Sequence, residues 1–203
     1  MVRTFTFSAA GGHPANEDAF ALVPTASGFR VALADGQGGR AGGAPAAQLA
    51  CRVALERAAS ASWEDALADA DAAVSADPLA GFTTLVALSV EGDLVRGASC
   101  GDSAAVAVWG NGLIRLLTAA QHKNPPVGSG EASFVPFKLQ LARPWKLLLI
   151  SDGVWKYAGW ERVWKSAANL SGDELLDDLQ RAARLPATGE FQDDFTAVLL
   201  ESE

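Results

Sequence analysis

Five short acidic segments of this chain each lie at the end of a stretch with the apolar pattern of a β-strand. They are Asn16-Glu17-Asp18, Asp35-Gly36-Gln37-Gly38-Gly39, Gly101-Asp102-Ser103, Ser151-Asp152-Gly153 and Asp193-Asp194. If these strand ends meet in the fold, their carboxylates repel one another and lose hydration unless cations bind between them. The pattern therefore predicts strand ends that converge on a metal centre. Oxygen ligands of this kind favour Mg²⁺ or Mn²⁺ over Zn²⁺.

The aspartates of these segments are the main candidate ligands. They are Asp18, Asp35, Asp102, Asp152 and Asp193. A single aspartate in a turn is more often a helix cap or part of an Asx-turn than a metal ligand. Five of them at comparable strand ends, two followed directly by glycine, favour a metal site. Gly36 has no side chain, so its main-chain carbonyl is a further candidate ligand.

The size and charge of the chain limit its class. A length of 203 residues with 49% hydrophobic residues suits one globular domain, which we expect to span residues 1–203. The net charge of −8 argues against non-specific nucleic-acid binding, which needs basic patches. We expect a monomer kept dispersed by its charge.

The sequence shows no disulfide framework and no membrane segment. Cys51 and Cys100 each lie in an apolar run without a CxxC partner, which predicts buried, reduced thiols. No stretch approaches the roughly 18 apolar residues that a bilayer-spanning helix needs. The first residues, Met1 to Phe5, lack the pattern of a signal peptide, so a cytoplasmic protein is expected.

The apolar periodicity predicts strands and helices in separate blocks. Strands are expected over Thr4–Ala10, Ala19–Pro24, Phe29–Ala34, Thr83–Val90, Leu94–Cys100, Ala104–Trp109, Leu113–Thr118, Trp145–Ile150 and Phe195–Leu200. Helices are expected over Ala44–Ser60, from the capping residue Ser62 to about Ala76, and over Val154–Ala168 and Ser171–Leu185, with Gln121–Glu131 as a loop. The segments Ala19–Pro24 and Phe29–Ala34 are expected to form a hairpin. The four strands from Thr83 to Thr118 are expected to form a meander. Because hairpins dominate, this order favours an α+β fold with mostly antiparallel sheets.

Two cations held by such carboxylates would have a definite chemistry. A water molecule that bridges them loses a proton near neutral pH and becomes a nucleophilic hydroxide. The same ions neutralise the charge that develops on a phosphate ester, and no covalent protein intermediate is required.

Six segments in order resemble a known family. They are Asn-Glu-Asp-Ala at 16–19, Ala-Asp-Gly-Gln-Gly-Gly at 34–39, Gly-Phe-Thr-Thr-Leu-Val at 81–86, Ala-Ser-Cys-Gly-Asp-Ser at 98–103, Ile-Ser-Asp-Gly-Val-Trp at 150–155 and Asp-Asp-Phe-Thr at 193–196. The set is similar to the motifs of the metal-dependent protein phosphatase family (PPM, protein phosphatase type 2C), in a compact bacterial form. The resemblance runs from about residue 8 to the end, and while each motif alone is weak, the full ordered set is highly specific.

The resemblance implies a four-layer α-β-β-α sandwich, two antiparallel sheets flanked by helices, with a dinuclear Mn²⁺ or Mg²⁺ centre. It implies hydrolysis of phosphoserine and phosphothreonine in proteins. By the resemblance, Asp35 bridges both metals and the Gly36 carbonyl binds one of them. Asp152 and Asp193 hold one metal.

Three further acidic residues receive weaker roles from the same resemblance. Glu17 acts mainly through bound water, and Asp18 contacts a metal directly or lies one layer further out. Asp102 corresponds to a carboxylate linked to an additional, weaker metal. Lys156 stands four residues after Asp152, where many relatives carry an acidic residue for that ion, so we expect two ions and doubt the third.

Two other positions depart from the family pattern. His13 stands where many members carry an arginine that contacts the substrate phosphate. Histidine can donate to phosphate but cannot form an arginine fork, so weaker substrate binding is expected, and a purely structural role is about equally open. Gln37 stands where some members carry a histidine proposed as a general acid, and glutamine cannot transfer protons.

The sequence thus favours a protein serine/threonine phosphatase with Asp35, Asp152, Asp193 and His13 as candidate catalytic residues. Its expected partners are a phosphorylated protein substrate and an opposing serine/threonine kinase. Two alternatives stay open. One is a catalytically weak phosphoprotein-binding or scaffold module of the same fold, and the other is a hydrolase of small phosphate esters.

Overall fold

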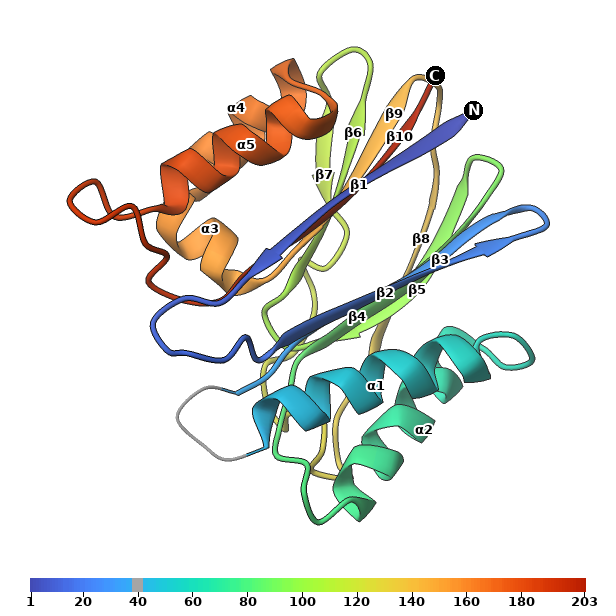
Figure 1. Ribbon diagram of the computed structural model, residues 1–203. Coiled ribbons are helices and arrows are strands. Elements are labelled where there is room, and N and C mark those ends of the chain that lie inside the picture. Colours follow the sequence, from blue (N-terminus) through green and yellow to red (C-terminus); the bar gives the residue numbers. More distant parts are fainter. Residues whose placement is uncertain (38–41) are drawn as a thin grey trace. The chain divides into compact units, whose positions relative to one another are not determined.

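The computed structural model describes residues 1–37 and 42–203, and it divides them into two compact units (Figure 1). Unit 1 comprises Met1–Asn16, Ala104–Leu117 and Leu141–Glu203. Unit 2 comprises Glu17–Ser103 and Thr118–Gln140. Each unit holds one five-stranded sheet, in which every neighbouring pair of strands is antiparallel.

Unit 2 contains the sheet with strand order β2-β3-β4-β5-β8 and the helices α1 and α2. Its elements are β2 (Asp18–Thr25), β3 (Gly28–Asp35), α1 (Gly43–Arg57), α2 (Trp63–Ala76), β4 (Leu85–Glu91), β5 (Leu94–Cys100) and β8 (Val135–Gln140). Small buried side chains on α1, among them Ala46, Ala50 and Ala54, pack with the sheet into one apolar core. Ser62 caps α2 as expected, because its Oγ accepts a hydrogen bond from the Asp65 N–H at 3.1 Å.

Unit 1 contains the sheet with strand order β1-β10-β9-β6-β7 and the helices α3, α4 and α5. Its elements are β1 (Val2–Ala9), β6 (Ala104–Trp109), β7 (Ile114–Leu116), β9 (Trp145–Ile150), α3 (Asp152–Ala158), α4 (Trp160–Asn169), α5 (Gly172–Ala183) and β10 (Phe195–Ser202). Leu175 and Leu179 of α5 pack in one core with Phe195 and Leu199 of β10. The central strands β9 and β10 are buried on both faces, which explains their continuous apolar runs.

The structure confirms the α+β class with two antiparallel sheets. Each unit pairs a sheet with a helix layer, and these are the components of the predicted α-β-β-α sandwich. The predicted free, buried thiols of Cys51 and Cys100 are also found. Among the described residues, no helix is long and apolar enough to cross a membrane. The single domain over residues 1–203 stays a prediction.

The predicted meander from Thr83 to Thr118 is wrong. β5 pairs with β4 and β8, whereas β6 pairs with β7 and β9 in the other sheet. The chain changes sheets at Gly101, whose φ of +118° lies in the region that favours glycine. A short turn between two apolar runs looks the same in sequence whether it closes a hairpin or leads to another sheet.

Two further differences concern single elements. The helix predicted over Val154–Ala168 is two helices, because Gly159 with a φ of +81° interrupts it between α3 and α4. Strand β8 was not predicted. It is an edge strand that contains Pro136 and exposes alternate side chains such as Lys138, so its apolar signal is weak.

Candidate metal centre

Asp18 and Asp35 face each other at the open end of the β2–β3 hairpin. Directly opposed residues of an antiparallel pair project to the same face, with Cβ atoms about 5 Å apart. Asp18 is 7% exposed and Asp35 is half-buried. Two like charges in this position destabilise the strand pair by themselves. The pair therefore fits a divalent cation, which would offset the repulsion.

Two threonines fix the main chain of Asp35. The Asp35 N–H donates to Thr84 Oγ1 at 2.9 Å, and the Asp35 carbonyl accepts from the Thr84 N–H at 2.9 Å and from Thr83 Oγ1 at 2.8 Å. Thr84 Oγ1 also lies 2.7 Å from Ser103 Oγ. The segment at residues 81–86, whose role the sequence left open, thus links the ends of β3 and β5.

Gly36 follows in a position that excludes any side chain. Its N–H donates to the Glu17 carbonyl at 3.2 Å, and an added Cβ would lie 2.5 Å from the Gly43 carbonyl carbon. The Glu17 carboxylate lies beside Gly43, with its oxygens 3.0 and 3.1 Å from where a Cβ on Gly43 would stand. Gly43 begins α1, and the amino end of a helix stabilises an anion. Gly38 and Gly39 of the same predicted segment lie outside the described residues.

Asp102 is neutralised by a lysine that the sequence did not indicate. Lys123 Nζ donates to Asp102 Oδ2, and the two side chains are 65% and 18% exposed. The two residues are 21 positions apart, so no local spacing could have paired them. The side chain predicted to serve an additional metal thus already has a cation as its partner.

The segments of Asp152 and Asp193 meet in unit 1. Asp152 is the first residue of α3 and is 9% exposed. An added Cβ on Gly153 would lie 2.0 Å from the Asp194 carbonyl oxygen and 3.3 Å from Asp193 Cβ. Only glycine allows this approach of the two main chains. The structure therefore brings these two predicted ligand segments into contact.

Asp194 holds the turn that precedes His13. Its carboxylate is buried and accepts a hydrogen bond from the Gly11 N–H at 2.9 Å. Its own N–H donates to Asp193 Oδ1 at 3.1 Å, which orients the Asp193 carboxylate. Asp194 therefore stabilises the turn at Gly11, whereas Asp193 is the predicted metal ligand.

Lys156 forms an ion pair with Asp152 Oδ2 one helical turn away. Lys156 thus places a positive charge against the Asp152 carboxylate. His13 is exposed, and its Nδ1 lies 2.7 Å from the Ala15 carbonyl oxygen. A carbonyl only accepts hydrogen bonds, so Nδ1 carries a proton in this arrangement.

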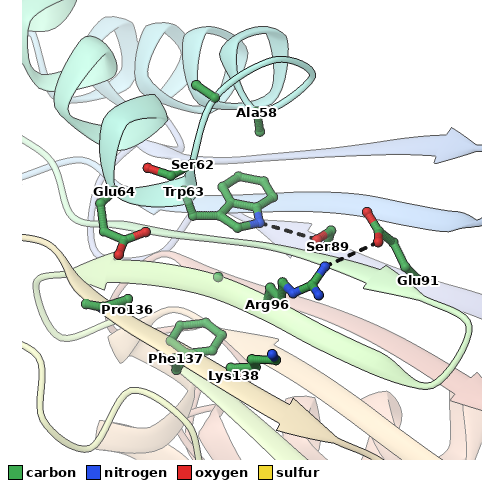
Figure 2. Close-up of a pocket in the computed structure, with 12 residues that line it drawn as sticks. Ala58, Ser62, Trp63, Glu64, Ser89, Glu91, Arg96, Pro136, Phe137 and Lys138 are labelled. Atoms are coloured by element: carbon green, nitrogen blue, oxygen red, sulfur yellow. Dashed lines mark hydrogen bonds and ion pairs between the residues drawn. The ribbon is translucent and has the colours of Figure 1, made fainter.

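A pocket in unit 2 is lined by residues other than the predicted metal ligands (Figure 2). Trp63 Nε1 donates to Ser89 Oγ at 3.3 Å, and Arg96 forms an ion pair with Glu91 at 3.6 Å. Figure 2 marks both contacts with dashed lines. These residues line the pocket near the end of β4 that is distant from Thr84. The pocket mixes charged and aromatic walls and includes none of the predicted metal ligands.

The predicted site residues thus form two groups, one in each unit. Unit 2 holds Glu17, Asp18, Asp35, Gly36 and Asp102 at the ends of β2, β3 and β5. Unit 1 holds His13, Asp152 and Asp193 beside the ends of β1, β9 and β10. Oxygen ligands dominate both groups, which suits Mg²⁺ or Mn²⁺.

The fold is that of bacterial serine/threonine phosphatases. A crystal structure of a bacterial serine phosphatase matches with a TM-score of 0.80 and 19% identity, over 100% of this chain and 98% of that chain. Serine/threonine phosphatase Stp1 from Staphylococcus aureus matches with a TM-score of 0.80 and 18% identity, over 100% and 96%. RsbX in complex with magnesium matches with a TM-score of 0.81 and 13% identity, over 98% and 94%.

The family follows from the sequence itself. The model of stage II sporulation protein E (SpoIIE) matches residues 25–203, and the chain belongs to this family. Together with the structural matches, this result supports the resemblance to the metal-dependent protein phosphatases. No curated protein matches the sequence at a significant level.

Proposed function

We propose that this chain is a metal-dependent protein phosphatase that hydrolyses phosphoserine and phosphothreonine in proteins. The observation that carries the proposal is the family match over residues 25–203, which includes Asp35, Asp152 and Asp193. The phosphatase structures of the same fold support it. We also propose that residues 1–203 form a single phosphatase-like domain of the compact bacterial form.

Asp35, the Gly36 carbonyl, Asp152 and Asp193 would hold two Mn²⁺ or Mg²⁺ ions. The opposed carboxylates of Asp18 and Asp35 support a cation in unit 2, and a protein of the same fold has been solved with magnesium. When bound, such ions supply Lewis-acid charge to a phosphate ester and lower the pKa of water. Glu17 would act through bound water, and Asp18 would contact an ion directly or support its ligands.

The chain's own residues orient these groups and the substrate. Thr83 and Thr84 hold the Asp35 main chain, and Asp194 holds the turn before His13 through Gly11. His13, with Nδ1 protonated toward Ala15, would donate from Nε2 to a phosphate oxygen when the imidazole is charged. Gln37 cannot transfer protons, so the leaving alkoxide would take its proton from water.

The proposed cellular role is to reverse a serine/threonine kinase on a phosphorylated protein. A cytoplasmic monomer with a single domain suits this role. The test is release of phosphate from phosphoserine and phosphothreonine peptides with Mn²⁺ or Mg²⁺, with and without a chelator, beside small phosphate esters. Turnover that a chelator does not affect would contradict the proposal, and turnover confined to small esters would favour a small-molecule hydrolase.

A second candidate is a catalytically weak module that binds phosphoproteins. The ion pairs Lys123–Asp102 and Lys156–Asp152 favour it, because each lysine competes with a divalent ion for a carboxylate. His13 and Gln37 also favour it, because both depart from the pattern of the phosphatase family. Tight binding of a phosphopeptide without turnover at saturating Mn²⁺ would identify such a module.

A further inference from the structure

A pocket of about 800 Å³ lies in unit 1 between the turn before Pro14 and the segment before Asp193. Its lining includes His13, Tyr157, Arg184, Glu190, Phe191 and Gln192. The volume falls in the range of pockets that bind ligands, and it is much larger than a phosphate group requires. Nothing in the sequence indicated this pocket, because its lining comes from three separated segments.

Arg184 is held in this pocket by two contacts. Its guanidinium lies over the Phe191 ring, 4.0 Å from the centroid, and Nη1 donates to the Gly189 carbonyl at 2.6 Å. Among residues 1–37 and 42–203, no carboxylate forms an ion pair with Arg184. A guanidinium has five N–H donors in a fixed fork, so this one still has donors to offer a planar anion.

The pocket adjoins the Asp193 segment through the glycine turn. An added Cβ on Gly12 would lie 2.5 Å from the Gln192 carbonyl oxygen, and one on Gly11 would lie 2.2 Å from the Asp193 carbonyl oxygen. The main chain that lines the pocket at Gln192 therefore runs directly into the candidate ligand. A peptide whose phosphorylated side chain reaches Asp193 would lay its neighbouring residues over this pocket.

We propose that this pocket binds the residues that flank the phosphorylated side chain of the substrate, and that Arg184 selects an acidic side chain there. The inference rests on the proposed function and names a substrate preference for it. A carboxylate matches the fork of Arg184 in two parallel hydrogen bonds, which an ammonium cannot make with a guanidinium. Tyr157, which is 36% exposed, offers a hydroxyl to the same peptide.

The experiment compares two phosphothreonine peptides that differ only in their flanks, one with glutamates and one with alanines. Phosphate release is measured with Mn²⁺ for the wild type, Arg184→Gln, Arg184→Lys and a control, Arg115→Gln. Arg115 is exposed on β7 of the same unit, so its substitution tests the loss of a charge elsewhere. p-Nitrophenyl phosphate, which has no flanks, reports the chemistry alone.

The wild type is expected to prefer the glutamate peptide about tenfold in kcat/KM. Arg184→Gln should remove this preference by raising the KM for the glutamate peptide. Arg184→Lys should keep part of the preference, and Arg115→Gln should keep all of it. Turnover of p-nitrophenyl phosphate should stay within about twofold throughout. Equal losses on both peptides, or a preference that survives Arg184→Gln, would overturn the inference.

A binding measurement tests the inference without any turnover. The glutamate peptide carries a fluorescent label, and its affinity for each variant is measured by fluorescence anisotropy. The Arg184→Gln variant should bind it about tenfold more weakly than the wild type, and unchanged affinity would overturn the subsite. If the wild type hydrolyses no substrate with either ion, the proposed function fails, and this binding measurement still tests Arg184. The melting temperature of each variant shows whether it is folded.

Discussion

Lys123 forms an ion pair with Asp102 within unit 2, although 21 positions separate them in the chain. The lysine is 65% exposed and the aspartate only 18%, so the ammonium can leave the carboxylate at small cost. Exposed pairs of this kind contribute about 0.2–1 kcal/mol. The lysine would therefore weaken the proposed binding of a cation at Asp102 without blocking it.

Replacing Lys123 by alanine should strengthen the binding of an additional ion at Asp102. Because the pair contributes at most about 1 kcal/mol, the affinity of the weakest Mn²⁺ site should rise by up to about fivefold. Calorimetric titration with Mn²⁺ measures this change. Lys138→Ala removes an exposed lysine from β8 and serves as the matched control. Identical titrations of wild type and Lys123→Ala would show that Asp102 holds no ion.

The Asp35→Asn substitution should abolish metal-dependent turnover. It removes the carboxylate proposed to bridge both ions, so kcat should fall by ~100-fold or more. Without metal the variant should melt at the same or a higher temperature, because the repulsion with Asp18 is gone. With excess Mn²⁺ the wild type should gain thermal stability and the variant should not. Asp69→Asn, which alters an exposed ion pair with Arg57, is the control.

Local features of this fold could be read from the sequence, whereas pairings between distant segments could not. The β2–β3 hairpin and the Ser62 cap depend on residues close in the chain, and both were predicted. The change of sheet at Gly101 depends on which strands β5 meets, which the turn itself does not encode. The break between α3 and α4 at Gly159 was not predicted, because the helical spacing of apolar residues continues on both sides of it.

In the candidate site, too, the local features could be predicted and the contacts between distant segments could not. The carboxylates were found because strand ends carry a local signal. Lys123 and Arg184 were not found, because their partners and pocket come from separated segments. Thr84 belongs to the segment at residues 81–86 that resembles a family motif. The hydrogen bond that its Oγ1 accepts from the Asp35 N–H could not be predicted, because it depends on the pairing of β3 with β4.

Replacing His13 by arginine should lower KM for phosphopeptides by about threefold to tenfold. Arginine stays charged and can make two parallel hydrogen bonds to a phosphate, which a histidine cannot. kcat should change less, because the substitution adds binding and no acid–base group. Steady-state kinetics at pH 7.5 separate the two constants. His122→Arg makes the same change at the other histidine, and an unchanged KM in both variants would assign His13 a structural role.

The two thiols should resist alkylation in the folded protein. Burial, with the charge of Asp71, raises the pKa of Cys100 to about 11, and burial raises the pKa of Cys51 further. At pH 8 roughly one Cys100 in a thousand is then a thiolate, which is the reactive form. Iodoacetamide should label neither thiol without denaturant and both in concentrated urea, as mass spectrometry measures. Rapid labelling of either thiol in the folded protein would contradict its burial.

Asp178 joins α5 to α4 and should make the protein sensitive to acid. Its carboxylate accepts hydrogen bonds from Arg162 Nε at 2.7 Å and from Ser166 Oγ at 2.5 Å. The hydrogen bond from Arg162 lowers the pKa of Asp178 below its ordinary value of 3.8, despite the opposing effect of burial. The stability from this group is therefore fully present above about pH 4 and is lost as the pH falls through the lower, folded-state pKa.

Asp178→Asn should accordingly lower the melting temperature at pH 7 by about 5 °C. The difference from the wild type should shrink as the pH falls below 4, because the wild-type carboxylate becomes protonated there. Asp177→Asn, an exposed neighbour on the same helix, should change the melting temperature by much less. Thermal denaturation followed by circular dichroism from pH 2.5 to 7 measures both effects. A constant difference between wild type and Asp178→Asn across this range would mean that the carboxylate's charge does not stabilise the α4–α5 contact.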